Sequence, residues 1–185
     1  MTPRRFLFLV ANAREPGHLG NTEWLARQAA AALPPDVPQR WLALSGLDLP
    51  PFVDRRHTVG EYPLPQGDLR TIFDAMREAS DIVLVAPVYW FSFPTSLKAL
   101  MDHWSAWIRI PSVPFKSEMA GKTFRLVSTS GDRTKAQPMV DSARLCAGFF
   151  GAAWGGVLWG KGGAPKAVEA DLAALEAARS FLAVT

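Results

Sequence analysis

The run from Asp81 to Ala86, DIVLVA, constrains the fold more than any other feature of the sequence. Beyond Asp81 its apolar residues are continuous, and such a pattern is typical of a strand buried on both faces within a parallel sheet. Four other segments have strand character: Arg5–Ala11, Gln39–Leu44, Thr123–Ser128 and Ala153–Trp159. The sequence therefore predicts a five-stranded parallel sheet.

Segments with apolar residues three and four positions apart, the spacing of one helix face, separate and follow these strands. In one of them Ile72, Phe73 and Met76 share a face, and in the next Pro94 fits a first-turn position. The predicted helices are Asn21–Leu33, Leu69–Ala79, Phe93–Trp107, Lys135–Phe150 and Pro165–Leu182, and the proline-rich stretch Ser45–Pro65 is expected to be irregular. This alternation predicts one doubly wound α/β domain over residues 1–185.

Charge and cysteine content exclude several other classes of protein. The chain has 20 Lys and Arg against 17 Asp and Glu, a net charge of +3 without any basic run, so nucleic-acid binding is not indicated. A single cysteine, Cys146, excludes an internal disulfide framework, a four-cysteine zinc site and a protein-ligated iron–sulfur cluster. No run approaches the ~20 apolar residues of a membrane span. The apolar stretch at the first strand is too short for a signal peptide. The single cysteine fits a reducing compartment, so we expect a cytoplasmic protein.

The segment Asn12–Thr22 joins the first predicted strand to the first helix. Ligands of open parallel sheets bind beyond the carboxyl ends of the strands, and this loop offers what a phosphate group needs. Gly20 allows a close approach of the backbone, and Arg14 supplies a positive charge. Asn21 and Thr22 offer side-chain donors beside the N–H groups of the helix. The alternative is that Asn21 or Thr22 only caps the helix.

Three adjacent aromatic residues, Tyr89, Trp90 and Phe91, lie in the loop directly after the central strand. Apolar residues in that place can wall a flat heteroaromatic ring while their backbone N–H groups bond its polar edge. Lys98 and Asp102, four residues apart on the following helix, are expected to form an ordinary side-chain pair. The sequence thus predicts a ring-binding segment beside a phosphate-binding one.

Two glycine-containing motifs have simpler interpretations. Gly121-Lys122-Thr123 precedes a strand, whereas a P-loop must follow one, so a turn is expected there. Gly160, Gly162 and Gly163 imitate a dinucleotide fingerprint, but Pro165 stands where its last glycine belongs. We expect a loop after the fifth strand.

Several residues of the middle helices are expected to be structural. His103 is interpreted as a partly buried structural histidine, with contact to a substrate as the alternative, and Cys146 as a buried, inert thiol. Apolar residues on the helix of His103 can form a contact between subunits, because apolar surface beside a site is often covered by a partner. They are Trp104, Trp107, Ile108 and Ile110.

The stretch PVYWFSFPTSLKALMD resembles the signature of the flavodoxin-like NAD(P)H-dependent FMN reductases and quinone reductases. The loop before GNTEWLA is similar to the phosphate loop of that family, and the order of strands and helices matches over essentially the whole chain. The resemblance implies a flavodoxin-like three-layer sandwich, with strand order 2-1-3-4-5 and helices on both faces. It also implies a homodimer or homotetramer.

The same resemblance implies a set of residues that bind FMN. Around the phosphate it places Arg14, Gly20, Asn21 and Thr22, together with Asn12, which stands where the family usually has serine in a shorter loop. Along the isoalloxazine ring it places Pro87, Val88, Tyr89, Trp90, Phe91 and Ser92, with backbone N–H groups of Trp90 and Phe91 facing the ring. The third loop that contacts the flavin corresponds to Ser130, Gly131 and Asp132.

The function implied is an oxidoreductase that passes hydride from NADPH or NADH through bound FMN to a quinone or a similar small acceptor. The flavin carries the redox chemistry, so no catalytic side chain is assigned. One alternative is a flavodoxin-type electron carrier, but such carriers are typically acidic and a sequence pI near 9.3 counts against it. The other is a non-catalytic flavin-binding regulatory or scaffold protein. The sequence does not choose between NADPH and NADH.

Overall fold

The computed structural model describes residues 4–15 and 17–183 and contains one sheet of five parallel strands in the order β2-β1-β3-β4-β5. The strands are β1 (Phe6–Val10), β2 (Gln39–Ala43), β3 (Asp81–Val85), β4 (Thr123–Ser130) and β5 (Ala153–Lys161). The five predicted strands and their order are confirmed. The last two run two residues further than predicted, toward the edge of the sheet where loops gather.

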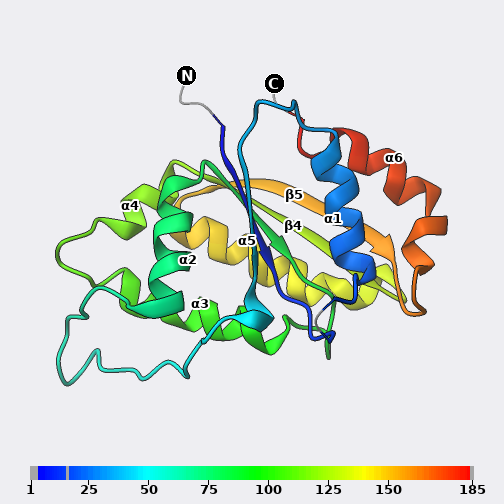
Figure 1. The fold of residues 1–185 in the computed structure, drawn as a ribbon. Coiled ribbons are helices and arrows are strands. Elements are labelled where there is room, and N and C mark those ends of the chain that lie inside the picture. Colours follow the sequence, from blue (N-terminus) through cyan, green and yellow to red (C-terminus); the bar gives the residue numbers. More distant parts are fainter. Residues whose placement is uncertain (1–3, 16, 184–185) are drawn as a thin grey trace.

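Helices cover both faces of this sheet (Figure 1). On one face lie α1 (Asn21–Ala31) and α6 (Leu172–Phe181), and on the other lie α2 (Gly67–Glu78), α3 (Thr95–Trp107), α4 (Phe115–Ala120) and α5 (Gln137–Phe150). Alternate residues of β1 divide between the two cores: Phe6 and Phe8 pack toward α1, whereas Leu7 and Leu9 pack toward α2 and α3. All five residues of β1 are buried, because helices cover both sides of the sheet. The predicted flavodoxin-like three-layer sandwich is confirmed.

Helix boundaries differ from the predicted ones where short turns precede a helix. The closing helix was predicted from Pro165, but a 3-10 turn, η3 (Ala167–Ala170), comes first, and α6 begins only after Asp171. An Asp171 carboxylate oxygen accepts a hydrogen bond from the Ala174 N–H at 3.1 Å and so caps α6. Similarly, η2 (Arg133–Ala136) precedes α5, and Pro94 lies just before α3 instead of in its first turn.

The proline-rich stretch Ser45–Pro65 is irregular, as predicted, apart from the 3-10 turn η1 (Leu44–Gly46) at its beginning. It runs past α3, where a ring nitrogen of His103, Nε2, lies 2.8 Å from the Pro50 carbonyl oxygen. The His103 side chain also packs edge-on against Phe52, and the residue is only 9% exposed. These contacts support the structural interpretation of His103.

The subunit contact expected at the end of α3 and just after it is wrong for three of its four residues. Trp104, Trp107 and Ile110 are buried in the core of their own chain, where the indole of Trp107 packs against Phe73 and Phe115. Trp104 likewise packs edge-on against rings of β4 and α5. These side chains join α3 to the sheet and to its neighbours, so they are not free for a partner.

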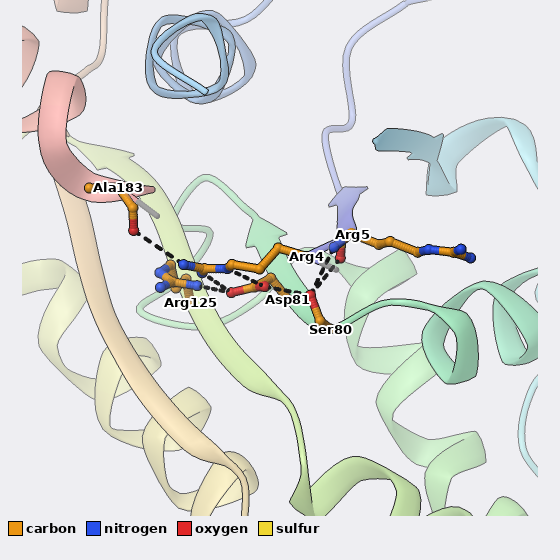
Figure 2. A network of polar contacts seen from close by, with 6 residues as sticks. All are labelled: Arg4, Arg5, Ser80, Asp81, Arg125 and Ala183. Carbon is orange, nitrogen blue, oxygen red and sulfur yellow. Dashed lines mark hydrogen bonds and ion pairs between the residues drawn. The ribbon is translucent and has the colours of Figure 1, made fainter. Parts of the chain in front are cut away.

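Figure 2 shows a polar network at the amino ends of the strands. Asp81, the first residue of β3, accepts hydrogen bonds from Arg4, Ser80 and Arg125. Arg4 also donates to the Ala183 carbonyl oxygen at 3.2 Å, so the start of β1 is tied to the end of α6. This network marks the edge of the sheet opposite to the loops described next.

Candidate functional site

A cavity of about 370 Å³ opens at the carboxyl ends of β1, β3 and β4. Three loops that are far apart in the sequence form most of its walls, since the strands that carry them are neighbours in the sheet, and Gly163 in the loop after β5 completes the lining. The residues that line it are Asn12, Arg14, Gly20, Asn21, Thr22, Glu23, Pro87, Val88, Tyr89, Trp90, Phe91, Thr129, Ser130, Gly131, Lys135 and Gly163. The cavity therefore lies where an open parallel sheet is expected to bind a ligand.

Every residue predicted for the site lines this cavity except Ser92 and Asp132. Those two instead hold the loops that form it. The Ser92 N–H donates to the Tyr89 carbonyl oxygen at 3.0 Å. The Asp132 carboxylate accepts from the Thr134 N–H at 2.8 Å, and this bond lowers the pKa of Asp132 below its ordinary value. The Ser92 backbone and the Asp132 carboxylate thus hold the second and third loops in shape, and neither residue lines the cavity.

Four lining residues were missed: Glu23, Thr129, Lys135 and Gly163. Glu23 lies on the first turn of α1 and Thr129 at the end of β4. Each directly adjoins a residue predicted for the site, so extending the two predicted segments by one residue would have included both. Gly163 belongs to the glycine-rich segment after β5, which the sequence predicts to be a simple loop. Its partial similarity to a dinucleotide fingerprint is the one clue that the sequence offers for a role in binding.

The first loop leaves the amino end of α1 open toward the cavity. Asn21 and Thr22 are the first two residues of α1, preceded by Gly20 as N-cap without any side-chain capping bond. The alternative that one of them only caps the helix is therefore wrong. A Cβ on Gly20 would lie 3.0 Å from Nε of Arg14, so the missing side chain makes room for that guanidinium against the helix end.

Asn12 and Thr22 are each held by a neighbouring element. The Asn12 amide donates to a Glu23 carboxylate oxygen at 3.1 Å, and the other oxygen of Glu23 pairs with Arg27 at 2.7 Å. Thr22 is 4% exposed, and its hydroxyl lies 2.6 Å from that of Thr129. The second contact joins the first loop directly to the end of β4.

The aromatic segment forms a tight turn with two residues in the left-handed region. Tyr89 and Ser92 exchange two backbone hydrogen bonds of 3.0 Å, while Trp90 and Phe91 between them have φ of 49° and 63°. A left-handed backbone costs about 1–2 kcal/mol per non-glycine residue. Among the described residues nothing accepts a backbone hydrogen bond from Trp90 or Phe91. The turn therefore offers free N–H donors and aromatic surface, and Trp90 is 93% exposed.

The third loop is braced by side chains. The Trp159 indole donates to the Ser130 hydroxyl at 2.8 Å, and that hydroxyl donates to the Asp132 carbonyl oxygen at 2.6 Å. Lys135, from η2, reaches the cavity beyond this brace. Within residues 4–15 and 17–183, neither Lys135 nor Arg14 has a carboxylate within 4.0 Å, so both cations are available to a ligand.

Residues outside the cavity agree with their simpler interpretations. Lys98 and Asp102 form an ion pair of 2.5 Å on α3. Lys122 precedes β4 in a turn and donates to the carbonyl oxygens of Arg77 and Ala79. Cys146 is half-buried instead of buried as predicted, and this partial burial raises the pKa of its thiol, which favours the unreactive protonated form.

Neither a metal cluster nor a membrane-spanning helix is found in the described part of the chain. No three His, Cys, Asp or Glu side chains there come close enough together to hold an ion. No helix there combines the length and the apolarity needed to cross a bilayer.

The residues of the cavity suit an elongated ligand that carries both an anion and a flat ring, as FMN does. A cation and free helix N–H groups lie at one loop, and aromatic walls with free N–H donors lie at the next. The buried amide of Asn21 also carries an oxygen, Oδ1, without a hydrogen-bond partner among the described residues.

Comparisons with known proteins agree with this site. The sequence profile of the family described as NADPH-dependent FMN reductase matches residues 5–157. YwqN of Bacillus subtilis, whose assignment as an NAD(P)H-dependent FMN-containing oxidoreductase is itself inferred, is 28% identical over 166 residues, which cover 88% of this chain and 90% of YwqN.

Two solved structures illustrate the shared fold. The Trp repressor binding protein of Bacillus subtilis superposes with a TM-score of 0.73 at 23% identity over 97% of this chain and 99% of its own. An FMN-dependent NADH-azoreductase of Bacillus anthracis, solved in complex with FMN, gives 0.62 at 13% identity over 96% and 94%. The predicted family, with FMN as cofactor and a nicotinamide co-substrate, is confirmed. The chain belongs to the NADPH-dependent FMN reductase family.

Proposed function

We propose that this chain holds one FMN in the cavity at the carboxyl ends of its strands and passes hydride from NADPH or NADH to a quinone or a similar small acceptor. The observation that carries the proposal is the meeting of three loops around one cavity, each with chemistry suited to a different part of the flavin. Family membership supports the reaction class, and the choice of acceptor is ours.

Each loop has its own task in this proposal. Arg14 and the open end of α1 bind the phosphate, because oriented N–H groups and a guanidinium both favour an anion. The turn around Trp90 and Phe91 walls the ring and donates N–H bonds to its polar edge. The backbone of Gly131 and the ammonium of Lys135 line the same cavity and would stabilise negative charge on a reduced ring. Ser92 and Asp132 keep the second and third loops in shape.

Bound FMN would accept hydride from the nicotinamide and donate hydride to the second substrate, and the protein would position both reactants around it. Trp90 and Phe91 are 93% and 52% exposed, so their rings are free to pack against whatever flat molecule enters above the turn. Because nicotinamide and a quinone are both flat, the two can use the same surface in succession. Nothing in this scheme needs a proton-transferring side chain among the lining residues.

A titration tests the cofactor site. FMN added to the apoprotein is expected to lose its fluorescence and to raise the melting temperature. Arg14→Met should weaken this binding at least tenfold, since a charge-assisted hydrogen bond is worth about 1.5–3 kcal/mol. Arg133→Met removes the same charge from η2, outside the lining, and should bind FMN as the wild type does. Absence of both fluorescence and thermal responses would overturn the proposal.

Anaerobic mixing tests the reaction and separates it from its rivals. NADPH or NADH should bleach the bound flavin, and a quinone should then restore its colour. A flavodoxin-type carrier or a non-catalytic flavin-binding scaffold would bind FMN yet stay yellow with both nucleotides. Because azoreductases share this fold, an azo dye and free FMN are tested beside the quinone, and the highest kcat/KM identifies the preferred acceptor class.

We infer a homodimer or a homotetramer from the surface between α3 and α5. Leu145 and Phe149 are 71% and 57% exposed there, beside a groove of about 440 Å³ that Met101 and Ile108 also line. A patch of large exposed apolar side chains is a common mark of a contact between subunits. Light scattering should give a multiple of 20.2 kDa, and Leu145→Asp should reduce it to one chain. Cell fractionation tests the expected cytoplasmic location.

A further inference from the structure

Trp159 on β5 holds a residue of the cavity wall through its indole. The register of the sheet pairs Trp159 with Ser128, so Ser130, two residues further along β4, lies on the same side of the sheet. The indole N–H donates to the Ser130 hydroxyl at 2.8 Å, and Ser130 itself lines the cavity. Trp159 does not line the cavity, so its influence on a ligand must pass through Ser130.

The direction of each hydrogen bond in this contact is determined by the groups that take part. An indole N–H can only donate, and a backbone carbonyl oxygen can only accept. The Ser130 hydroxyl therefore accepts from Trp159 and gives its single hydrogen to the Asp132 carbonyl oxygen, 2.6 Å away. Because that hydrogen is no longer available to a ligand, the Ser130 hydroxyl acts as a link between β5 and the third loop.

Hydrogen bonds to the carbonyl oxygens orient the peptide planes of the third loop. The described part of the chain has only trans peptides, in which the C=O and the following N–H point in opposite directions. The Ser130 carbonyl oxygen accepts from the Gly162 N–H at 2.8 Å, which turns the Gly131 N–H away from the segment after β5. The Asp132 carbonyl oxygen faces the Ser130 hydroxyl, which turns the Arg133 N–H the opposite way. The backbone of the loop is thus held by β5 and the residues that follow it.

The two groups that the proposed function assigns to the reduced ring both depend on this link. Gly131 lines the cavity, and its N–H has no acceptor among the described residues. Lys135 also lines the cavity, and its backbone N–H donates at 3.3 Å to the Asp132 carbonyl oxygen that the Ser130 hydroxyl holds. Hydride adds a negative charge to a neutral ring, and a free N–H and an ammonium both favour that charge.

We propose that Trp159 is a positioning residue that sets the reduction potential of the bound cofactor. Its indole N–H, acting through the Ser130 hydroxyl, holds the third loop so that the Gly131 N–H and the Lys135 ammonium stabilise the negative charge added on reduction. The inference rests on the proposed function, because it assumes a flavin in this cavity. It adds a residue of β5, outside the lining, to the groups that decide how readily hydride is accepted.

Dissociation constants of oxidised and of dithionite-reduced FMN test the proposal. Trp159→Phe removes the indole N–H and keeps an aromatic ring. This variant should bind reduced FMN about three- to tenfold more weakly than the wild type does, the effect of one hydrogen bond, and oxidised FMN within about twofold. The midpoint potential of bound FMN, measured against a redox dye, should fall in step, because a tenfold change corresponds to ~30 mV for a two-electron couple.

Two further variants separate the hydrogen bond from the bulk of the side chain. Trp154 is half-buried on the same strand, whereas the indoles that donate a hydrogen bond among the described residues are those of Trp41 and Trp159. Trp154→Phe should therefore leave both dissociation constants and the potential at their wild-type values. Ser130→Ala breaks the link itself, so Trp159→Phe should have no additional effect in that background.

Three outcomes overturn the inference. Equal weakening of oxidised and reduced FMN would mean that Trp159 only shapes the cavity. A further loss from Trp159→Phe in the Ser130→Ala background would mean that its bulk acts without the link, and wild-type values in Trp159→Phe would mean that it has no role. If the wild type binds FMN in neither state, the proposed function itself fails, which differs from all three results.

A measurement on the apoprotein tests the link without any flavin. Amide hydrogen exchange over residues 130–136 should accelerate to the same extent in Trp159→Phe, in Ser130→Ala and in the double variant. Unchanged exchange in these variants would show that the link does not hold the loop, whatever their affinity for FMN. Melting of each apoprotein is recorded first, and Ser130→Ala provides the comparison if Trp159→Phe is unfolded, since it breaks the same link.

Discussion

Trp90 and Phe91 hold a backbone conformation that suits neither of them. Both are left-handed, which is the pattern of a two-residue hairpin turn normally occupied by Asn-Gly. The double substitution Trp90→Asn with Phe91→Gly should raise the free energy of urea unfolding of the apoprotein by about 1–2 kcal/mol, because it gives the turn residues that adopt this backbone readily. The same variant should bind FMN at least tenfold more weakly, because the aromatic wall is gone.

Trp90→Ala separates backbone strain from lost aromatic surface. It removes the indole but keeps a side chain in the left-handed region, so it should weaken FMN binding without any gain in stability. If the double variant is no more stable than Trp90→Ala, the turn is not strained. A gain in the double variant alone would show that the site gives up stability for its aromatic residues.

Individual residues also show which features of the site could be predicted from the sequence and which could not. The aromatic triplet was found because three such rings in a loop after a buried strand are unusual. The left-handed turn was not found, since neither residue is one that normally adopts it. Ser92 and Asp132 were assigned to the right loops but are exposed and do not line the cavity, and Lys135 enters the cavity only through the 3-10 turn η2. Side-chain direction depends on tertiary contacts that a sequence pattern does not contain.

The packing of β5 against α1 and η3 depends on Gly160. A Cβ there would lie 2.7 Å from a Val168 methyl and 2.9 Å from a Leu25 methyl, closer than side chains pack. Gly160→Ala should therefore lower the free energy of urea unfolding by about 1–3 kcal/mol, the usual cost of overpacking. The effect should reach the cofactor as weaker FMN binding, because β5 runs on to the loop that holds Gly163.

Gly148→Ala is the matched control. Gly148 lies within α5, a Cβ there meets nothing within 4 Å, and alanine favours a helix over glycine by about 0.8–1 kcal/mol. This variant should be as stable as the wild type or more so. If both alanine variants shift the urea midpoint in the same direction, close packing at Gly160 is not the cause.

Helices and strands with a long apolar pattern were easier to predict from the sequence than short ones. The strands β1 and β3 were found because continuous burial leaves a continuous apolar run, as in DIVLVA, whereas β2 and β5 are only partly buried and have weaker patterns. α4 was missed because its six residues are too few to show a helical period. The start of α6 was placed too early, since apolar spacing continues through η3 and only the cap at Asp171 separates the two.

The architecture of the whole molecule came from family resemblance. Alternating strands and helices predict a parallel sheet, but the order β2-β1-β3-β4-β5 depends on which way each crossover turns along the sheet, and no local pattern records that choice. The network around Asp81 was equally invisible, because Arg4, Asp81 and Arg125 are distant in sequence. It now joins three strands and the end of α6 at the edge away from the cavity (Figure 2).

Removing the charge of Asp81 should weaken the whole fold and leave the cofactor site intact. The Asp81 side chain is 3% exposed, and Arg125 beside it is 11% exposed. Asp81→Asn leaves buried guanidinium groups without their counter-charge, so the free energy of urea unfolding at pH 7 should fall by about 3–5 kcal/mol. The FMN affinity of the folded variant should stay within about twofold of wild type, since the network lies at the opposite edge of the sheet.

The pH dependence of stability identifies the charge as the cause. Burial alone would raise the pKa of Asp81, but hydrogen bonds from Arg4, Ser80 and Arg125 outweigh it and hold that pKa below the ordinary value. The stability from ionised Asp81 is therefore complete above the unfolded pKa, about 3.9, and is lost as the pH falls through the lower pKa of the folded state. Urea midpoints from pH 6 to pH 2 should fall more steeply for wild type than for Asp81→Asn. Parallel profiles would mean that Asp81 stabilises the edge by shape and hydrogen bonding, without its charge.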